Sequence, residues 1–259
     1  MSIRQRSEAS RKALAAAVIA SLFVVAGAAC SHAPEPNQPA PTAQPSEAAE
    51  KPRDDKQDDQ TTVVGGVYGD PAAAVEYWEE QTESDCGLMA TRLVIGEITG
   101  APPTEREIID LAAKTPSECD PGQPVYDESI DPSDGGVGHG TCTTDLLLLL
   151  KHYGIHADYT NDETASKGGL ATGMDALADY LGDGRQAIVC VNSNTIWETD
   201  GDKTGCGHLV TVAAIDYDND AVYLGDSGGD DTKGEHVTTD VFESAWAAGD
   251  HELVITAPR

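Results

Sequence analysis

Residues 81–100 read Q-T-E-S-D-C-G-L-M-A-T-R-L-V-I-G-E-I-T-G, a polar segment that runs into an apolar pattern at Cys86. Ser84 and Asp85 are good N-cap residue types, so a helix is expected to begin at Cys86. Amide groups at a helix N-terminus favour thiolate over thiol, and a thiolate attacks carbonyl carbon. The stretch predicts a nucleophile at Cys86, against the alternative of a buried structural cysteine. Gln81 would donate its side-chain amide to the oxyanion that forms beside it.

The last third of the chain offers a base for this nucleophile. His208 opens an apolar strand over 208–215, and a second strand over 221–225 ends at Asp226. A hairpin of these two strands places His208 and Asp226 together at the ends away from the turn. The carboxylate there would fix the tautomer and orientation of the imidazole. A histidine at the first position of a strand is expected at the edge of the sheet, not deep in the core.

Three motifs resemble those of the papain-like peptidase family C-39-like: Q-x4-D-C-G from Gln81, Gly-His before an apolar strand at His208, and D-x-G-G from Asp226. The resemblance covers about residues 68–255. It implies an α+β fold of the papain-like type, with an N-terminal helical half packed on a C-terminal antiparallel sheet. It also implies that Cys86 is the nucleophile, His208 the base, Asp226 the orienting acid and Gln81 the oxyanion donor.

The chain departs from the family pattern at Leu88 and Ser227, where many members have proline. Neither departure removes a catalytic group. The expected function is therefore a thiol hydrolase that cleaves a peptide or protein substrate, without metal or other cofactor. Two alternatives are an amidase or acyltransferase that acts on a cell-wall amide, and a binding module that retains the same residues without turnover.

The first 29 residues are typical of a secretory signal, with basic residues, an apolar run from Ala13 to Ala29 and small residues at its end. Ala28-Ala29-Cys30-Ser31 is also the local pattern of a bacterial lipoprotein. We expect Cys30 to carry a lipid that anchors an extracytoplasmic protein to the cell membrane. Plain secretion is the alternative, favoured by Gly27, where a larger aliphatic residue is usual.

The rest of the chain divides by composition. Residues 30–66 are rich in Pro, Ala and acidic residues and read as a disordered tether, whereas residues 67–259 are expected to form one papain-like domain. The net charge of −29 argues against nucleic-acid binding through general electrostatics. A monomer is expected.

Further elements follow from local patterns. Thr104 and Glu107 form a capping box that opens a helix through about Lys114. The run Leu146–Leu150 covers all sides of a helix over 143–153, which is expected to be the central buried one. Another helix and a strand are expected over 170–181 and 186–192, and a final helix and strand over 240–247 and 252–256. Helices followed mainly by antiparallel strands indicate an α+β fold.

Four other cysteines follow Cys86. A disulfide between Cys119 and Cys142 is favoured because it would close the long Asp-, Pro- and Gly-rich loop between them. A Cys190–Cys206 disulfide is the less secure pairing, since strand register would separate the two α-carbons; a buried free Cys190 is the alternative.

Acidic and histidine-containing segments outside these motifs are assigned to turns and loops. Asp216-x-Asp218-x-Asp220 begins like a calcium loop, but it lacks the later glycine and glutamate and is interpreted as a hairpin turn. Residues 199–204 are likewise interpreted as a turn. His139 is a candidate to line the cleft. The remaining histidines show no zinc-ligand spacing with the cysteines: His152, His156, His236 and His251.

Overall fold

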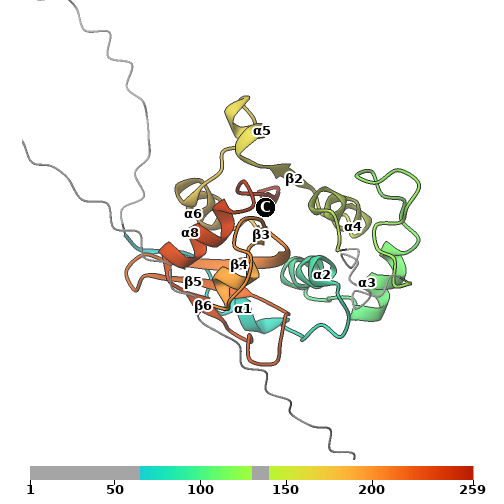
Figure 1. The fold of residues 1–259 in the computed structure, drawn as a ribbon, viewed down its shortest axis with the longest axis horizontal. Coiled ribbons are helices and arrows are strands. Elements are labelled where there is room, and N and C mark those ends of the chain that lie inside the picture. Colours follow the sequence, from blue (N-terminus) through green and yellow to red (C-terminus); the bar gives the residue numbers. More distant parts are fainter. Residues whose placement is uncertain (1–64, 130–139, 259) are drawn as a thin grey trace, which may run out of the picture. The chain divides into compact units, whose positions relative to one another are not determined.

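The computed structural model describes residues 65–129 and 140–258 (Figure 1). The predicted signal, residues 30–64 of the predicted tether (Cys30 among them) and His139 lie outside the described residues.

A seven-stranded antiparallel sheet forms the centre of this part of the chain. Its order is β2-β7-β3-β4-β5-β6, and the short β1 also pairs with β4. The strands are β1 Val67–Gly69, β2 Ala157–Thr160, β3 Ala187–Val191, β4 His208–Asp216, β5 Ala221–Gly225, β6 His236–Val237 and β7 Leu253–Thr256. Sequence reasoning anticipated β3, β4, β5 and β7. It missed β1, β2 and β6, which have between two and four residues each and are too short to show strand periodicity.

The predicted helix at Cys86 is confirmed as α2, Cys86–Thr99. The other helices are α1 Ala73–Glu76, α3 Glu105–Ala112, α4 Leu146–His152, α5 Asp162–Ser166, α6 Met174–Gly182, α7 Ser193–Ile196 and α8 Thr239–Ala247, with a 3-10 turn η2 over Thr143–Asp145. The capping box before α3 is also confirmed, since Thr104 and Glu107 make both of its hydrogen bonds.

The expectation that the leucine-rich helix is the central buried one is wrong. Leu146, Leu149 and Leu150 are fully buried, but Leu147 and Leu148 are only half-buried. Helix α4 therefore has one buried face and one partly exposed face. The central helix is α2, where every residue from Gly87 through Gly96 is buried. Five successive leucines indicate an apolar helix but do not show how many of its sides have a partner.

Two helical layers cover the two faces of the sheet. In β3, Ile188 and Cys190 pack with α2, α3 and α4, whereas Ala187, Val189 and Val191 pack with α6 and α8. Figure 1 shows α2, α3 and α4 grouped on one side of β4, and α6 and α8 on the other. Because successive strand residues point to opposite faces, a strand buried on both sides reads as a continuous apolar run. The α+β class is thus confirmed, with a second helical layer that sequence reasoning did not foresee.

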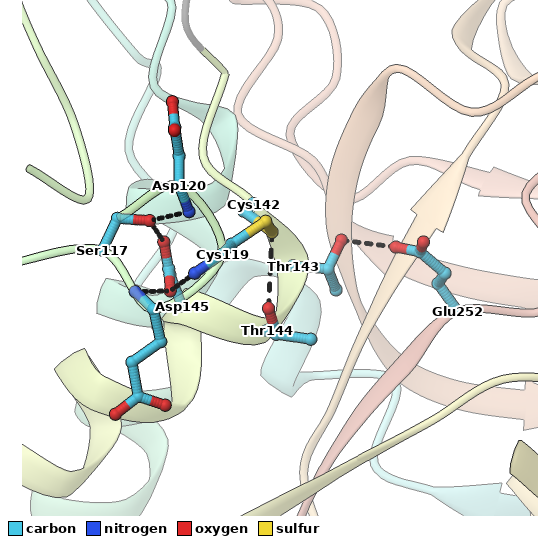
Figure 2. Close-up of a disulfide and its surroundings, with 9 residues drawn as sticks. Ser117, Cys119, Asp120, Cys142, Thr143, Thr144, Asp145 and Glu252 are labelled. Atoms are coloured by element: carbon cyan, nitrogen blue, oxygen red, sulfur yellow. Dashed lines mark hydrogen bonds between the residues drawn. A yellow bond between two sulfur atoms is a disulfide. The ribbon is translucent and has the colours of Figure 1, made fainter. Parts of the chain in front are cut away.

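The described residues contain two disulfides. Cys119 and Cys142 are joined across the ends of the long loop, at a Cα–Cα distance of 6.4 Å. Figure 2 shows this bridge beside Asp145, which accepts hydrogen bonds from Ser117 Oγ at 2.6 Å and from the backbone amides of Glu118 and Cys119.

The second disulfide, Cys190–Cys206, resolves the alternative left open by the sequence. In the ladder Cys190 pairs with Leu209, so strand register alone would place Cys206 out of reach. However, β4 begins only at His208, and the preceding chain returns to bring the two α-carbons within 5.6 Å. The bridge therefore joins a ladder residue of β3 to a residue that precedes β4. Sequence register could not show this, because it extrapolates the strand beyond its end.

Among the described residues, no helix combines the length and the apolar character needed to cross a membrane.

Candidate active site

Cys86 is the first residue of α2, and its side chain is partly exposed. The next residue, Gly87, allows the helix N-terminus to approach β4 closely. A Cβ atom at this position would lie 2.8 Å from Leu209 Cδ1 and 3.1 Å from Thr141 Cβ, closer than side-chain atoms normally pack. The Asp-Cys-Gly order therefore has a physical reason: the glycine lets the thiol reach the start of the strand that carries His208.

His208 and Asp226 form a buried pair, as the hairpin pattern predicted. His208 is the first residue of β4 and Asp226 directly follows β5. His208 Nε2 lies 2.7 Å from Asp226 Oδ1. The expectation that the histidine ring lies at the sheet edge needs correction, because His208 is only 6% exposed. The ring of Trp197 covers it, with the two ring centroids 5.1 Å apart.

The Cys86 thiol is hydrogen-bonded to the side chain of His208. Because Nε2 is engaged with Asp226, Nδ1 is the ring nitrogen left to face the sulfur. The structure thus brings Cys86, His208 and Asp226 together in one line, from the helical layer to the sheet.

Electrostatics within this line favour a thiolate and an imidazolium. Burial raises the pKa of the Cys86 thiol, but the hydrogen bond and charge of His208, with backbone amides of Leu209 and Gly87, lower it below its ordinary value. Burial alone would lower the pKa of His208, yet its bonds to Asp226 and Cys86 raise it to about 10. A thiolate with an adjacent proton donor is the state that attacks carbonyl carbon and then protonates a leaving amine.

Asp226 is held from several directions by donors. It has no exposed surface, and its carboxylate accepts bonds from Gly228 N at 2.7 Å and Trp197 Nε1 at 3.2 Å in addition to His208. Burial raises the pKa of Asp226, but the hydrogen bond and charge of His208, with the backbone amide of Gly228, lower it below its ordinary value. Its backbone carbonyl accepts further bonds from Trp78 Nε1 and Thr232 Oγ1.

Trp78 and Trp197 were missed as site residues by sequence reasoning. Each lies in a short segment without a motif, and a lone tryptophan gives no signal of what its indole N–H will contact.

Gln81 is tied to the segment that follows Asp226. Its backbone N donates to Ser227 O at 2.9 Å, and its side-chain oxygen accepts from Ser227 Oγ at the same distance. Its Nε2 donates to Glu83 O at 2.9 Å, which leaves the second N–H of the amide for another acceptor. Ser227, one of the two departures from the family pattern, thus orients Gln81. Leu88, the other departure, is fully buried in the core.

Asp85 precedes the cysteine but does not cap the helix with its side chain. It is 1% exposed, and neither carboxylate oxygen has a hydrogen-bond partner in the structure described. Burial, together with the charge of Glu105, raises the pKa of Asp85 to about 7. Sequence reasoning correctly placed Asp85 next to the helix start, but its role as a capping acceptor is not observed.

A cavity of about 680 Å³ lies on the His208–Asp226 side of the site. Trp197 and Gly228, both in contact with the carboxylate of Asp226, form part of its wall, and Glu198, Asp231 and Glu235 line it as well. Its size lies in the range of about 300–1,000 Å³ that is usual for ligand pockets.

Among the described residues, one group of three potential metal ligands lies close enough together to hold an ion: Cys190, Cys206 and Glu252. The two sulfurs of this group are joined in a disulfide, so neither offers a thiolate. The Asp216–Asp220 segment is a hairpin turn between β4 and β5, as interpreted from the sequence.

Comparison with known proteins shows a sequence family. The chain is 40% identical over 200 residues to the uncharacterized protein Rv1268c of Mycobacterium tuberculosis and to the uncharacterized protein Mb1299c of Mycobacterium bovis. Each alignment spans 75% of this chain and 86% of the relative. The chain therefore belongs to the same family as these mycobacterial proteins. No protein-family model matches it.

A solved structure shares the fold. It is a Bacillus anthracis protein provisionally designated a C39-like peptidase, similar with a TM-score of 0.50 and 15% sequence identity. The match covers 75% of this chain and 98% of that one. At this identity the likeness concerns the fold alone, a mixed arrangement of helices and antiparallel sheet.

Proposed function

We propose that this protein is a papain-like cysteine peptidase of the C-39-like type. The observation that carries the proposal is the line of Cys86, His208 and Asp226, with the thiol on a helix N-terminus and the imidazole hydrogen-bonded on both sides. The fold shared with the C39-like protein of Bacillus anthracis supports the same assignment.

In the proposed reaction, the Cys86 thiolate attacks the peptide carbonyl carbon and a C–S bond forms. The backbone amide of Cys86 and the free N–H of the Gln81 amide would stabilise the oxyanion. His208 then gives its proton to the amine as the C–N bond breaks, which leaves a thioester. Water, deprotonated by His208, hydrolyses the thioester and restores the thiol. Asp226 keeps the imidazole in the tautomer and orientation that both steps need.

A peptide-library digest tests this function. The purified full chain should generate new peptide termini that the Cys86→Ala variant does not, as detected by mass spectrometry. Cys86→Ala removes only the sulfur at a partly exposed position, so the variant is expected to fold. Identical digests from both proteins would contradict the peptidase assignment.

We also propose that the protein is exported and lipid-anchored at Cys30. The sequence pattern Ala28-Ala29-Cys30-Ser31 supports the anchor. The two disulfides support export, since such bonds persist mainly outside the cytoplasm. The native protein should partition into detergent, and Cys30→Ala should accumulate as precursor or be released to the medium. A mature native protein that stays in the aqueous phase would contradict the anchor.

A further inference from the structure

Glu235 brings a second carboxyl group to Asp226. It directly precedes β6, which pairs with β5, and its backbone carbonyl accepts a hydrogen bond from Leu224 N at 2.9 Å. This pairing places Glu235 beside the end of β5, where its carboxyl group hydrogen-bonds that of Asp226. Sequence reasoning missed Glu235, because a glutamate in an acidic loop has no distinguishing spacing.

The other partners of Asp226 indicate which of the two acids carries a proton. His208 Nε2, Gly228 N and Trp197 Nε1 all lie within hydrogen-bonding distance of its oxygens. The amide and the indole can only donate, and an imidazolium donates as well, so these contacts favour an ionised Asp226. Two carboxyl groups in direct contact share one proton, because two adjacent negative charges repel strongly. The proton therefore belongs to Glu235, which becomes a further donor.

We infer that Glu235 is a protonated positioning residue, whose carboxyl group donates a hydrogen bond to Asp226 and so holds that carboxylate against His208. One oxygen of Glu235 is buried without a hydrogen-bond partner within the residues described. A neutral carboxyl tolerates this better than a carboxylate, for which lost solvation costs far more. The inference rests on the proposed role of Asp226 as the partner of His208.

The surroundings of Glu235 set the pH at which its proton leaves. Burial, followed by the charge of Asp226, raises the pKa of Glu235 to about 8. The charges of His208 and Asp231 also act on it, in opposite directions, and Glu198 and His236 line the same cavity. Below that pH the hydrogen bond to Asp226 is present. Above it, Asp226 loses a donor and gains a neighbouring negative charge.

Nuclear magnetic resonance can observe this without any substrate. In the ¹⁵N-labelled full chain, the ring signals of His208, assigned by their loss in His208→Ala, should shift with an inflection near pH 8. Glu235→Gln cannot ionise and should lack that inflection. Asp231→Asn is the matched control, because it removes a carboxylate from the same cavity wall and should keep the inflection.

A wild-type protein without an inflection near pH 8, or a Glu235→Gln variant that retains it, would overturn the inference. If Glu235→Gln does not fold, ¹³C-carboxyl labelling of glutamate in the wild type supplies the test. One glutamate carboxyl should then titrate near pH 8, far above the ordinary 4.5, and its absence would also overturn the inference.

A reactivity measurement separates positioning from packing. Alkylation of Cys86 by iodoacetamide, followed by mass spectrometry of its peptide, should slow about tenfold in Glu235→Ala, the lower part of the range for one lost hydrogen bond to a charged group. Glu235→Gln keeps an N–H donor and should retain more of the rate. Equal loss in both variants would show that Glu235 only fills space. Neither the NMR titration nor the alkylation of Cys86 needs substrate turnover. A negative result in them would therefore contradict the role of Glu235 without bearing on the peptidase activity that the peptide-library digest tests.

Discussion

Asp85 and Asp226 are equally buried, but their surroundings are opposite. Asp226 lies at the end of β5 and is surrounded by donors from His208, Gly228 and Trp197. Asp85 lies at the start of α2, beside the nucleophile, and neither of its oxygens has a hydrogen-bond partner in the described part of the chain. Burial raises the pKa of both, yet only Asp226 ends below its ordinary value, whereas that of Asp85 rises to about 7.

The comparison shows that burial alone does not make a carboxylate part of the site. Donors on the sheet side keep Asp226 ionised, so that it can orient and charge His208. On the helix side, Asp85 is destabilising when ionised and adds negative charge next to the thiol. In the proposed mechanism Asp226 therefore takes part in the chemistry, whereas Asp85 is a cost in stability that the site tolerates.

The largest effect is expected at Asp226. Asp226→Asn should lower peptide-cleavage rate by about 10²–10⁴-fold, because the amide no longer selects the correct tautomer of His208. The measurement is turnover of a peptide taken from the library digest, with melting temperature as the control for folding. A variant that folds and cleaves at the wild-type rate would contradict the proposal that Asp226, unlike Asp85, supports the chemistry.

Asp145 is a third buried aspartate to compare with Asp85 and Asp226. It has hydrogen-bond partners, as Asp226 has, but it is expected to contribute to stability and not to the reactivity of Cys86. It is 1% exposed and bonded to Ser117, Glu118 and Cys119 beside a disulfide (Figure 2). Asp145→Ala should lower the free energy of unfolding by about 2–3 kcal/mol, since it leaves buried donors unpaired. Chemical denaturation measures this loss. Alkylation of Cys86 should be unchanged, and a parallel loss of thiol reactivity would show that this cluster supports the site directly.

A smaller effect of opposite sign is expected at Asp85. The folded protein holds the Asp85 proton up to pH about 7, whereas the unfolded chain releases it near 3.8. Stability contributed by this residue thus falls as pH rises between these values, and the penalty is complete above pH 7. Asp85→Asn should raise the free energy of unfolding by about 1–2 kcal/mol at pH 8.

The same variant at pH 3.5 supplies the control for Asp85. There the wild-type carboxyl is neutral in the folded state and mostly neutral in the unfolded state, so the difference between wild type and Asp85→Asn should largely vanish. Destabilisation by Asp85→Asn at pH 8 would contradict the view that this carboxylate has no partner.

Much of this arrangement was predictable from the sequence because it depends on local patterns. The helix start at Cys86, the hairpin that joins His208 to Asp226 and the capping box at Thr104 each follow from residues close together in the chain. The α+β class followed from the order of helices and strands.

The rest depends on contacts that local patterns do not encode. Trp78 and Glu235 reach Asp226 from segments far from it or without a motif. Predicting the second helical layer would require knowing which face of the sheet the first layer of helices leaves uncovered. The Cys190–Cys206 bridge depends on the path of the chain just before β4 begins, where strand register no longer applies.

The central claim is that His208 holds Cys86 as a thiolate, and the pH dependence of Cys86 alkylation tests it most directly. Site-resolved mass spectrometry of the iodoacetamide-treated full chain measures the rate at each pH. Because the pKa of Cys86 lies below its ordinary value, the wild-type rate should persist as pH falls below about 8.5, the usual value for a free thiol. His208→Ala should lose this acidic reactivity and regain an ordinary profile. Identical profiles for the two proteins would contradict the account.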